Sequence, residues 1–296
     1  MVDLISLKSD PNKNAKRILV YGSAGFIGSR VIRALESFGN IVESQALTHL
    51  RIGPDTLGEL ALINKEFRPH LILNLTGGKS ESNHFERDHQ FANMNSSKLI
   101  IESIGHSRSP VRVVDLSTWR FYFDQGAYHY EDGYGLEKAI GYCRAKAAAQ
   151  KVSNLGYQTL FLPQVYSIDQ PRGDFFSLLI RKILSREEII IRNPLNLICP
   201  IRVEDVVDLL LKESLGESIW PRCSAKIILT NAITTLESLM VKVADCIRLE
   251  FGHSIKVYYP HKNSDVPNFR FQYDSLPHLI GRDMILPDIR SSMTGV

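Results

Sequence analysis

Short apolar runs and segments of helical periodicity alternate along most of the chain. Each apolar run has the length of a buried β-strand, and the segments between them carry apolar residues on one helical face. Strands that alternate with helices form parallel βαβ units, so the pattern predicts an α/β fold with a doubly wound parallel sheet. Ligands of such sheets bind beyond the carboxyl ends of the strands. Strands are predicted at residues 18–21, 41–44, 70–75, 111–117 and 157–166, and helices after the first strand and at 91–104 and 136–152.

A glycine-rich turn connects the first predicted strand to the first predicted helix. The stretch "RILVYGSAGFIGS" places Gly22, Gly25 and Gly28 between an apolar run and a segment of helical periodicity. This is the G-x-x-G-x-x-G fingerprint of a dinucleotide-binding turn in its strand–turn–helix context. Glycine allows the backbone torsions of such a turn, and the helix amides that follow Phe26 and Ile27 can then face a pyrophosphate. The sequence therefore predicts a dinucleotide cofactor at this turn.

The end of the second predicted strand bears on which dinucleotide binds. NAD-selective folds carry an acidic residue there, about 20 residues after the glycines, which binds the ribose 2′-hydroxyl. Ala46 stands at that position, Glu43 comes too early, and the basic residues His49 and Arg51 follow. The missing acid and the nearby base favour a 2′-phosphate, and hence NADP(H) with Arg51 as a ligand. A shift in the strand register would favour NAD(H), which remains the alternative.

Composition and charge exclude several classes of function. The 296 residues are 44% hydrophobic and 23% charged, as is typical of a globular protein, and the net charge of +3 is too small to predict a nucleic-acid or membrane partner. Four scattered cysteines indicate free thiols in a reducing cytoplasm. His84, Asp88 and His89 are interpreted as polar loop residues, so no metal site is expected. Residues 1–16 are expected to form a polar leader.

Six stretches, in their order along the chain, carry a family resemblance: "YGSAGFIGS", "RPHLILNLTGG", "NMNSSKLIIE", "VVDLSTWRFY", "PIRVEDVVDLL" and "LTNAITTLESLMVKVAD". Together they make the chain resemble the extended short-chain dehydrogenase/reductase family, specifically its nucleotide-sugar epimerases, dehydratases and ketoreductases. Phe161, Ser167 and Ile198 depart from the residues usual in that family, which alters the expected substrate clamp. Trp119 and Arg120 replace the Asp-Glu pair of the 4,6-dehydratases, so dehydration is not expected.

The resemblance implies a Rossmann core at residues 17–166 and a smaller C-terminal lobe at 167–296. That lobe is expected to bind mainly the substrate, with part of it returning to the core. Asn93 is implied to brace a helix or a proton-relaying water. The residues implied to bind the cofactor are Gly22, Gly25, Phe26, Ile27, Gly28, Arg51, Thr76, Gly77, Asn93, Lys138, Pro163 and Val165.

The catalytic tyrosine and lysine have two candidate pairs, Tyr134 with Lys138 and Tyr142 with Lys146. Residues four apart lie on one helical face, where a lysine ammonium can lower the pKa of a phenol. Counted from Thr118, the 24 residues to Tyr142 are the commoner spacing in the family. The strong helix formers after Tyr134 predict instead that the helix starts just before this tyrosine, and family members place the tyrosine in the first turn. Tyr142 would lie roughly 12 Å further along the axis, so the first pair is favoured.

The leading hypothesis is an NADPH-dependent reductase of a nucleotide-linked 4-keto-6-deoxy sugar in deoxysugar biosynthesis. The resemblance implies that Thr118 and Tyr134 hydrogen-bond the sugar and that Lys138 binds the nicotinamide ribose. The alternatives are an NAD-retaining sugar-nucleotide 4-epimerase with the same residues, and a non-catalytic nucleotide-binding regulatory protein. A cytoplasmic homodimer is expected, in which small residues on the tyrosine helix would allow close pairing: Ala145, Ala147, Ala148 and Ala149.

Overall fold

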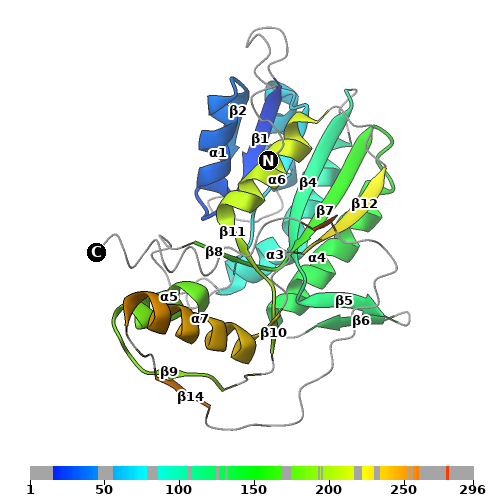
Figure 1. Ribbon diagram of the computed structural model, residues 1–296. Helices are drawn as coiled ribbons and strands as arrows, with labels where there is room; N and C mark the ends of the chain where they lie inside the picture. Colours follow the sequence, from blue (N-terminus) through cyan, green and yellow to red (C-terminus); the bar gives the residue numbers. More distant parts are fainter. Residues whose placement is uncertain are drawn as a thin grey trace. The chain divides into compact units, whose positions relative to one another are not determined.

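The computed structural model describes most of the chain between residues 16 and 279 (Figure 1). The chain divides into two compact units, one made of Met1–Leu162 and Val207–Ile227 and the other of Pro163–Val206 and Ile228–Val296. The residues described are 16–45, 56–78, 86–105, 109–124, 127–130, 133–167, 175–192, 194, 196–216, 222–229, 234–252, 254, 256–259 and 278–279.

A parallel sheet forms the centre of the first unit. Its strands lie in the order β12-β7-β4-β3-β1-β2, and every pairing between neighbours is parallel. The apolar side chains of residues 18–21 are all fully buried, as expected of a parallel strand that is covered on both faces. The strands are β1 (Arg17–Tyr21), β2 (Ile41–Gln45), β3 (Leu71–Asn74), β4 (Val111–Thr118), β7 (Leu155–Leu162) and β12 (Cys223–Leu229).

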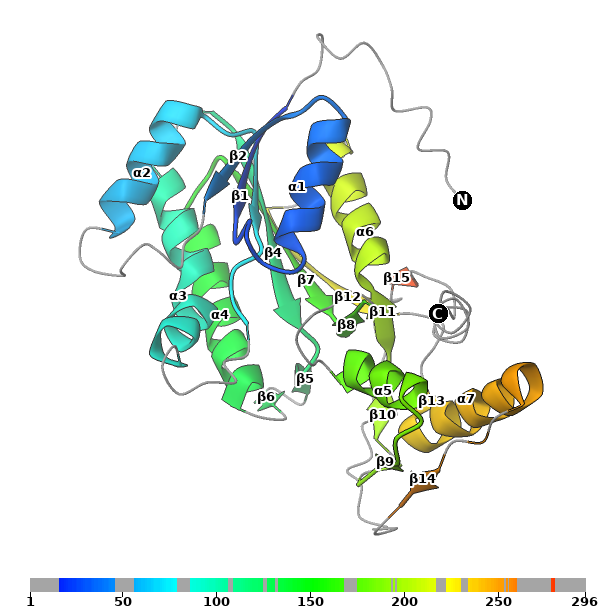
Figure 2. The same ribbon diagram turned by 90° about the vertical axis from the view of Figure 1, so that its left-hand side faces the viewer.

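Helices cover both faces of this sheet. Figure 2 shows α2, α3 and α4 on one side of the strands and α1 and α6 on the other. This is the doubly wound arrangement that the sequence predicts, and the α/β Rossmann fold is confirmed. The helices are α1 (Gly28–Ser37), α2 (Thr56–Phe67), α3 (Glu86–Ile104), α4 (Gly133–Ala149) and α6 (Val203–Leu215); a hairpin of β5 (Phe121–Asp124) and β6 (Ala127–Tyr130) precedes α4.

Helices α3 and α4 pack closely because a glycine lies between them. A Cβ atom on Gly141 would overlap the backbone carbonyl oxygen of Asn93. Further along α4, Ala145, Ala148 and Ala149 are buried in the core of their own chain. The expectation that these three alanines face a second copy is therefore wrong. Of the four alanines expected to allow pairing, only Ala147 is exposed.

The segment predicted as one strand at residues 157–166 forms two. β7 belongs to the central sheet, whereas β8 (Gln164–Tyr166) pairs with β11 (Pro200–Arg202) in the second unit. Pro163 separates the two strands, because proline has no N–H to donate to a sheet ladder. The prediction missed this break because it followed the apolar pattern across the proline.

The second unit has a smaller core of its own, to which Phe176 contributes from α5 (Phe175–Leu184) and Met240 from α7 (Leu236–Phe251). Thr235 caps the second of these helices by accepting the N–H of Ser238 (3.1 Å), and Gly252 ends it with a left-handed φ of 65°. The remaining elements are β9 (Ile189–Ile190), β10 (Leu197–Ile198), β13 (Thr234–Thr235), β14 (Val257–Tyr258) and β15 (His278–Leu279).

Candidate active site

The turn after β1 passes tightly from strand to helix. Gly22 adopts a left-handed φ of 80°, and a Cβ atom on it would lie 2.6 Å from the carbonyl oxygen of Leu75. Only glycine satisfies both conditions. The N–H of Gly25 donates to the Gly22 carbonyl (3.0 Å), and Gly28 starts α1 against the Gly22 backbone. The close backbone contacts at Gly22 and Gly28 therefore leave no room for a side chain at either position.

The start of α1 is suited to an anion. Ile27 occupies the N-cap position without a side-chain hydrogen bond to the helix amides, and the first turn contains no acidic residue. Amides at such a helix start carry a partial positive charge that binds phosphate. Arg30 adds a full positive charge in the first turn; its guanidinium lies 4.5 Å from the centre of the Phe26 ring and donates to the Phe26 carbonyl (2.9 Å). The pyrophosphate of a dinucleotide matches this charge.

The last residue of β2, Gln45, lies beside the start of the glycine turn and is not acidic. In the parallel pairing, Gln45 lies opposite Tyr21, the residue before Gly22, whereas Glu43 lies opposite Leu19 and is exposed. Glu43 is thus two residues short of the strand end, as its place in the sequence indicates. Ala46, His49 and Arg51 lie outside the described residues.

Lys138 is held at the carboxyl ends of two central strands. Its Nζ donates to the backbone carbonyls of Thr76, just after β3, and of Leu116, near the end of β4 (both 3.3 Å). The side chain is buried. A lysine ammonium has three N–H groups, so one remains for a ligand oxygen. Helix α4 begins at Gly133, which puts the half-buried Tyr134 in its first turn, as predicted, and one turn before Lys138.

Asn93 ties the segment after β3 to the tyrosine helix. Its Oδ1 accepts the N–H of Gly78 (3.3 Å), and its Nδ2 donates to the Gly78 carbonyl (3.1 Å) and to Glu137 Oε2 (2.8 Å). Gly77 has a φ of 107°, and a Cβ atom there would overlap Asn93 Oδ1 and lie 2.8 Å from Lys138 Nζ. Asn93 therefore braces α4 and the loop after β3. Sequence reasoning missed Glu137, although it stands beside Lys138.

Thr118 ends β4 as a buried hydroxyl, and its Oγ1 accepts the N–H of Arg120 (3.3 Å). The preceding hydroxyl, Ser117 Oγ, is also buried, and among the described residues it has no hydrogen-bond partner. Two hydroxyls thus end the strand whose Leu116 carbonyl holds Lys138. Pro163 and Val165 lie in the second unit, where Val165 pairs with Ile201 in the β8–β11 ladder.

Tyr142, the second candidate tyrosine, packs against an aromatic ring. The Tyr142 ring lies edge-to-face on Phe161, with ring centres 5.2 Å apart, and the ammonium of Lys146 lies 5.8 Å from the centre of the Tyr142 ring. Burial raises the pKa of the Tyr142 phenol, and Cys223 and Cys143 raise it further. A raised pKa opposes proton exchange near neutral pH. The surroundings of Tyr142 therefore favour a packing role for this pair.

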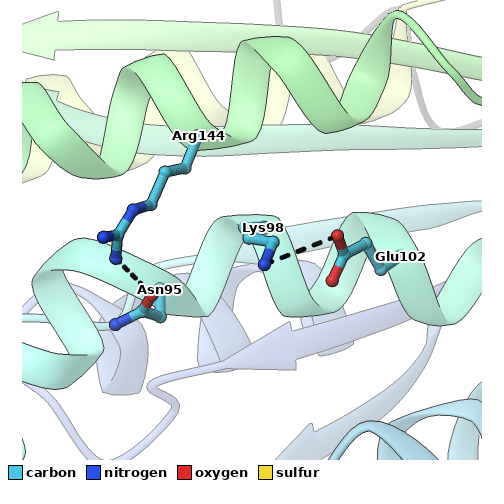
Figure 3. A network of polar contacts seen from close by, with 4 residues as sticks. All are labelled: Asn95, Lys98, Glu102 and Arg144. Carbon is cyan, nitrogen blue, oxygen red and sulfur yellow. Dashed lines mark hydrogen bonds and ion pairs between the residues drawn. The ribbon is translucent and has the colours of Figure 1, made fainter.

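One polar contact links α3 to α4 on their outer side, and an ion pair lies along α3 itself. Figure 3 shows Arg144 of α4 reaching Asn95 of α3, with 2.6 Å between Nη1 and Oδ1, and Lys98 paired with Glu102 along α3 (3.6 Å). Since Asn93 and Tyr134 are carried by these two helices, the contact between Arg144 and Asn95 helps to hold the site in place.

Metal-ligand clusters and membrane-spanning helices are both missing from the described ranges. None of their His, Cys, Asp and Glu side chains form a group of three that could hold a metal ion, and none of their helices is long and apolar enough to cross a membrane. Asp88 and His89 lie in α3 rather than in the predicted loop, because this helix starts at Glu86; His84 lies outside the described residues.

Comparison with protein families identifies a family to which this chain is similar. The model of the NAD dependent epimerase/dehydratase family covers residues 18–212, from β1 into α6. The chain belongs to this family. Members are NAD(P)-dependent enzymes, so the prediction of an enzyme of the epimerase/dehydratase type is confirmed. No match was found among curated protein sequences.

Solved structures with this fold include several nucleotide-sugar epimerases. UDP-N-acetylglucosamine 4-epimerase from Methanobrevibacter ruminantium M1, in complex with UDP-N-acetylmuramic acid, is 16% identical and superposes with a TM-score of 0.68 over 95% of this chain and 98% of that one. UDP-glucose 4-epimerase from Thermotoga maritima with UDP-glucose is 20% identical (TM-score 0.65; 83% and 87% covered). UDP-glucuronic acid 4-epimerase from Bacillus cereus, with UDP-glucuronic acid and NAD, is 14% identical (TM-score 0.64; 82% and 85% covered). This chain thus has the same fold as these epimerases.

Proposed function

We propose that this family member is an NADPH-dependent reductase of a nucleotide-linked 4-keto-6-deoxy sugar. The observation that carries the proposal is the position of Lys138, whose ammonium is held by the Thr76 and Leu116 carbonyls one helical turn after Tyr134. A cation fixed at the carboxyl ends of the strands, on the helix that presents a phenol, supports proton transfer by that phenol.

The bound cofactor would supply the hydride that reduces the sugar carbonyl. Tyr134 would donate its phenolic proton to the carbonyl oxygen as that oxygen gains negative charge, and Thr118 would hydrogen-bond the same oxygen. The charge of Lys138 would stabilise the phenolate left on Tyr134, and its remaining N–H would bind the nicotinamide ribose. Asn93 would keep α4 and the loop after β3 in place during the reaction. The cofactor's pyrophosphate would bind at the glycine turn and the start of α1, which has no side-chain cap.

The preference for NADP(H) rests on the end of β2, where Gln45 is the last paired residue and Ala46 follows in place of an acid. Titration of the purified protein with NADPH and NADH by fluorescence tests this preference. Arg51→Ala should weaken NADPH binding by about 1–3 kcal/mol, typical of a lost charged hydrogen bond, and spare NADH. Arg33→Ala, which removes an exposed arginine of α1 whose Nε donates to Ser29, is the matched control and should change neither affinity. NADH binding as tight as NADPH would contradict the preference.

A sugar-nucleotide 4-epimerase that retains NAD is the second candidate. Solved structures of this fold that carry UDP-sugars include 4-epimerases, which favours it. The two candidates differ in cofactor balance: a reductase oxidises one NADPH for each sugar reduced, whereas an epimerase converts the sugar with no net change in its cofactor. Analysis of the nucleotide released from the denatured protein, followed by NADPH oxidation against a panel of nucleotide 4-keto-6-deoxy sugars, separates them.

Three further parts of the proposal concern context. The four free thiols favour a cytoplasmic location, because such thiols persist in reducing compartments. The second unit is proposed to bind the sugar nucleotide. A homodimer is proposed from the family resemblance alone, since three of the expected pairing alanines are buried. A light-scattering mass near the 33.5 kDa of one chain would contradict the dimer.

A further inference from the structure

A carboxylate lies buried in the middle of the central sheet. Asp115, on β4, is 5% exposed and lies between the apolar residues Val114 and Leu116. Three side chains donate to it: Asn74 Nδ2 to Oδ1 (3.0 Å), and Ser97 Oγ (2.8 Å) and the Tyr157 hydroxyl (3.1 Å) to Oδ2. The Thr159 hydroxyl in turn donates to the Tyr157 oxygen (2.8 Å). Donors from β3, α3 and β7 thus converge on one buried anion.

The hydrogen bonds around Asp115 lead to Lys138. Asn74 also accepts the backbone N–H of Thr76 (3.2 Å) and its hydroxyl through Oδ1. The carbonyl of Thr76 receives the ammonium of Lys138, and the second carbonyl that receives it belongs to Leu116, the residue after Asp115. Both backbone groups that hold the lysine are therefore positioned by the strand and the side chains that surround this carboxylate.

The charges of Asp115 and Lys138 interact. Burial raises the pKa of Asp115, and the positive charge of Lys138 is the largest of the opposing effects, ahead of the three hydrogen bonds. Of the side chains bonded to the carboxylate, Tyr157 is the other titratable one, whereas Asn74 and Ser97 are neutral at all pH values of interest. A buried ammonium is stable when a counter-charge and hydrogen bonds compensate for its lost hydration. Here the two carbonyls supply the hydrogen bonds and Asp115 supplies the charge.

We propose that Asp115 is a positioning residue for the reaction: it is the buried counter-charge of Lys138 and fixes, through Asn74, the Thr76 carbonyl that holds the ammonium. The functional part of this inference rests on the proposed role of Lys138 beside Tyr134. The charge pair itself does not, because it is a property of the folded chain.

The variant Asp115→Asn tests the functional part, since it removes the charge and keeps the shape. Loss of a buried negative charge makes neighbouring groups lose their protons at lower pH, so both limbs of the kcat/KM–pH profile should move down by about one unit. Tyr157→Phe is the matched control, because it removes one hydrogen bond to the same carboxylate but keeps the charge; its limbs should stay in place. A uniform loss of rate in Asp115→Asn with unmoved limbs would show a purely structural role and overturn the proposal.

A double-mutant cycle tests the charge pair without any substrate. The urea midpoints of the parent, Asp115→Asn, Lys138→Met and the double variant are compared. Lys138→Met should lower the midpoint more in the parent than in Asp115→Asn. In the parent the substitution leaves the Asp115 carboxylate as an unpaired buried charge, whereas in Asp115→Asn no such charge is present. Additive midpoints would overturn the proposal. If Asp115→Asn does not fold alone, recovery of folding on adding Lys138→Met supports the pair, and lack of recovery contradicts it. Coupling in the cycle without turnover of any sugar would refute the proposed function alone.

Discussion

Gly77 offers a sharp test of the site because a side chain at this position would meet Asn93 and Lys138, two residues to which the proposal gives a role. Its φ of 107° belongs to the region that favours glycine, and a Cβ atom would overlap Asn93 Oδ1 and approach Lys138 Nζ to 2.8 Å. Both neighbours are ends of flexible side chains, so Gly77→Ala should fold but displace them. The displaced atoms are the brace of α4 and the ammonium proposed to bind the nicotinamide ribose.

The expected magnitude has two parts. A non-glycine residue held at such a φ costs about 1–3 kcal/mol of folding free energy. Loss of the charged hydrogen bond from Lys138 to the ribose would cost about 1.5–3 kcal/mol of cofactor binding, or roughly 10- to 150-fold in affinity. Substitution of a glycine far from the site would not produce this loss of cofactor affinity.

Urea unfolding and NADPH titration measure these two effects on one preparation. Gly58→Ala is the matched control: Gly58 lies in α2, and an added Cβ atom would have no atom within 4 Å. It should leave NADPH affinity unchanged and leave stability equal or raised by up to about 1 kcal/mol, the propensity difference between the two residues. If Gly77→Ala loses stability but binds NADPH as tightly as the parent, Lys138 and Asn93 do not contribute to the cofactor site, and the reasoning fails.

Three further outcomes are expected. Gly141→Ala should destabilise the protein by about 1–3 kcal/mol, because the added Cβ overlaps the Asn93 backbone, which cannot move without α3; a thermal midpoint equal to the parent's would contradict this packing. Thr235→Ala should lower the free energy of unfolding by about 0.5–2 kcal/mol, because it removes the acceptor of the Ser238 N–H at the start of α7. Thr234→Ala, at the neighbouring position that does not cap the helix, should lower it less in the same urea series. The pKa of Asp115 is raised in the folded protein, so the protonated carboxyl group stabilises the fold at low pH. This stabilisation is lost as the pH rises from the ordinary aspartate pKa, about 3.9, through the raised pKa of the folded state. In Asp115→Asn the urea midpoint should therefore not fall over this pH range as it does in the parent. If the variant and the parent show the same fall, the expectation is refuted.

Local sequence signals predicted the framework of the site. The order of apolar run, three glycines and amphipathic helix is a local pattern, and β1, the Gly22 turn and α1 follow it closely. The start of α4 at Gly133 likewise follows from a run of strong helix formers. Such features depend on residues close in the chain, so they can be read without the fold.

Features that depend on distant segments could not be predicted. The roles of Asp115 and Glu137 appear only when β3, α3 and β7 bring their donors together, because none of these donors is close to either acid in the sequence. Ala145 and Ala148 lie on a helix with small residues on several sides, and only the fold shows which side meets the core. The sheet break at Pro163 was visible in the sequence, and the apolar residues around it outweighed the missing N–H.

The central claim is that Tyr134, held one turn before the buried Lys138, is the acid of the reaction. The most direct measurement compares NADPH oxidation by the parent, Tyr134→Phe and Tyr142→Phe against a panel of nucleotide 4-keto-6-deoxy sugars. Loss of a general acid lowers the rate by about 10²–10⁴-fold, so Tyr134→Phe should lose that factor while its NADPH affinity stays close to the parent's. Tyr142→Phe should keep turnover within a few-fold, because its phenol packs on Phe161. A dead Tyr142→Phe beside an active Tyr134→Phe would contradict the claim.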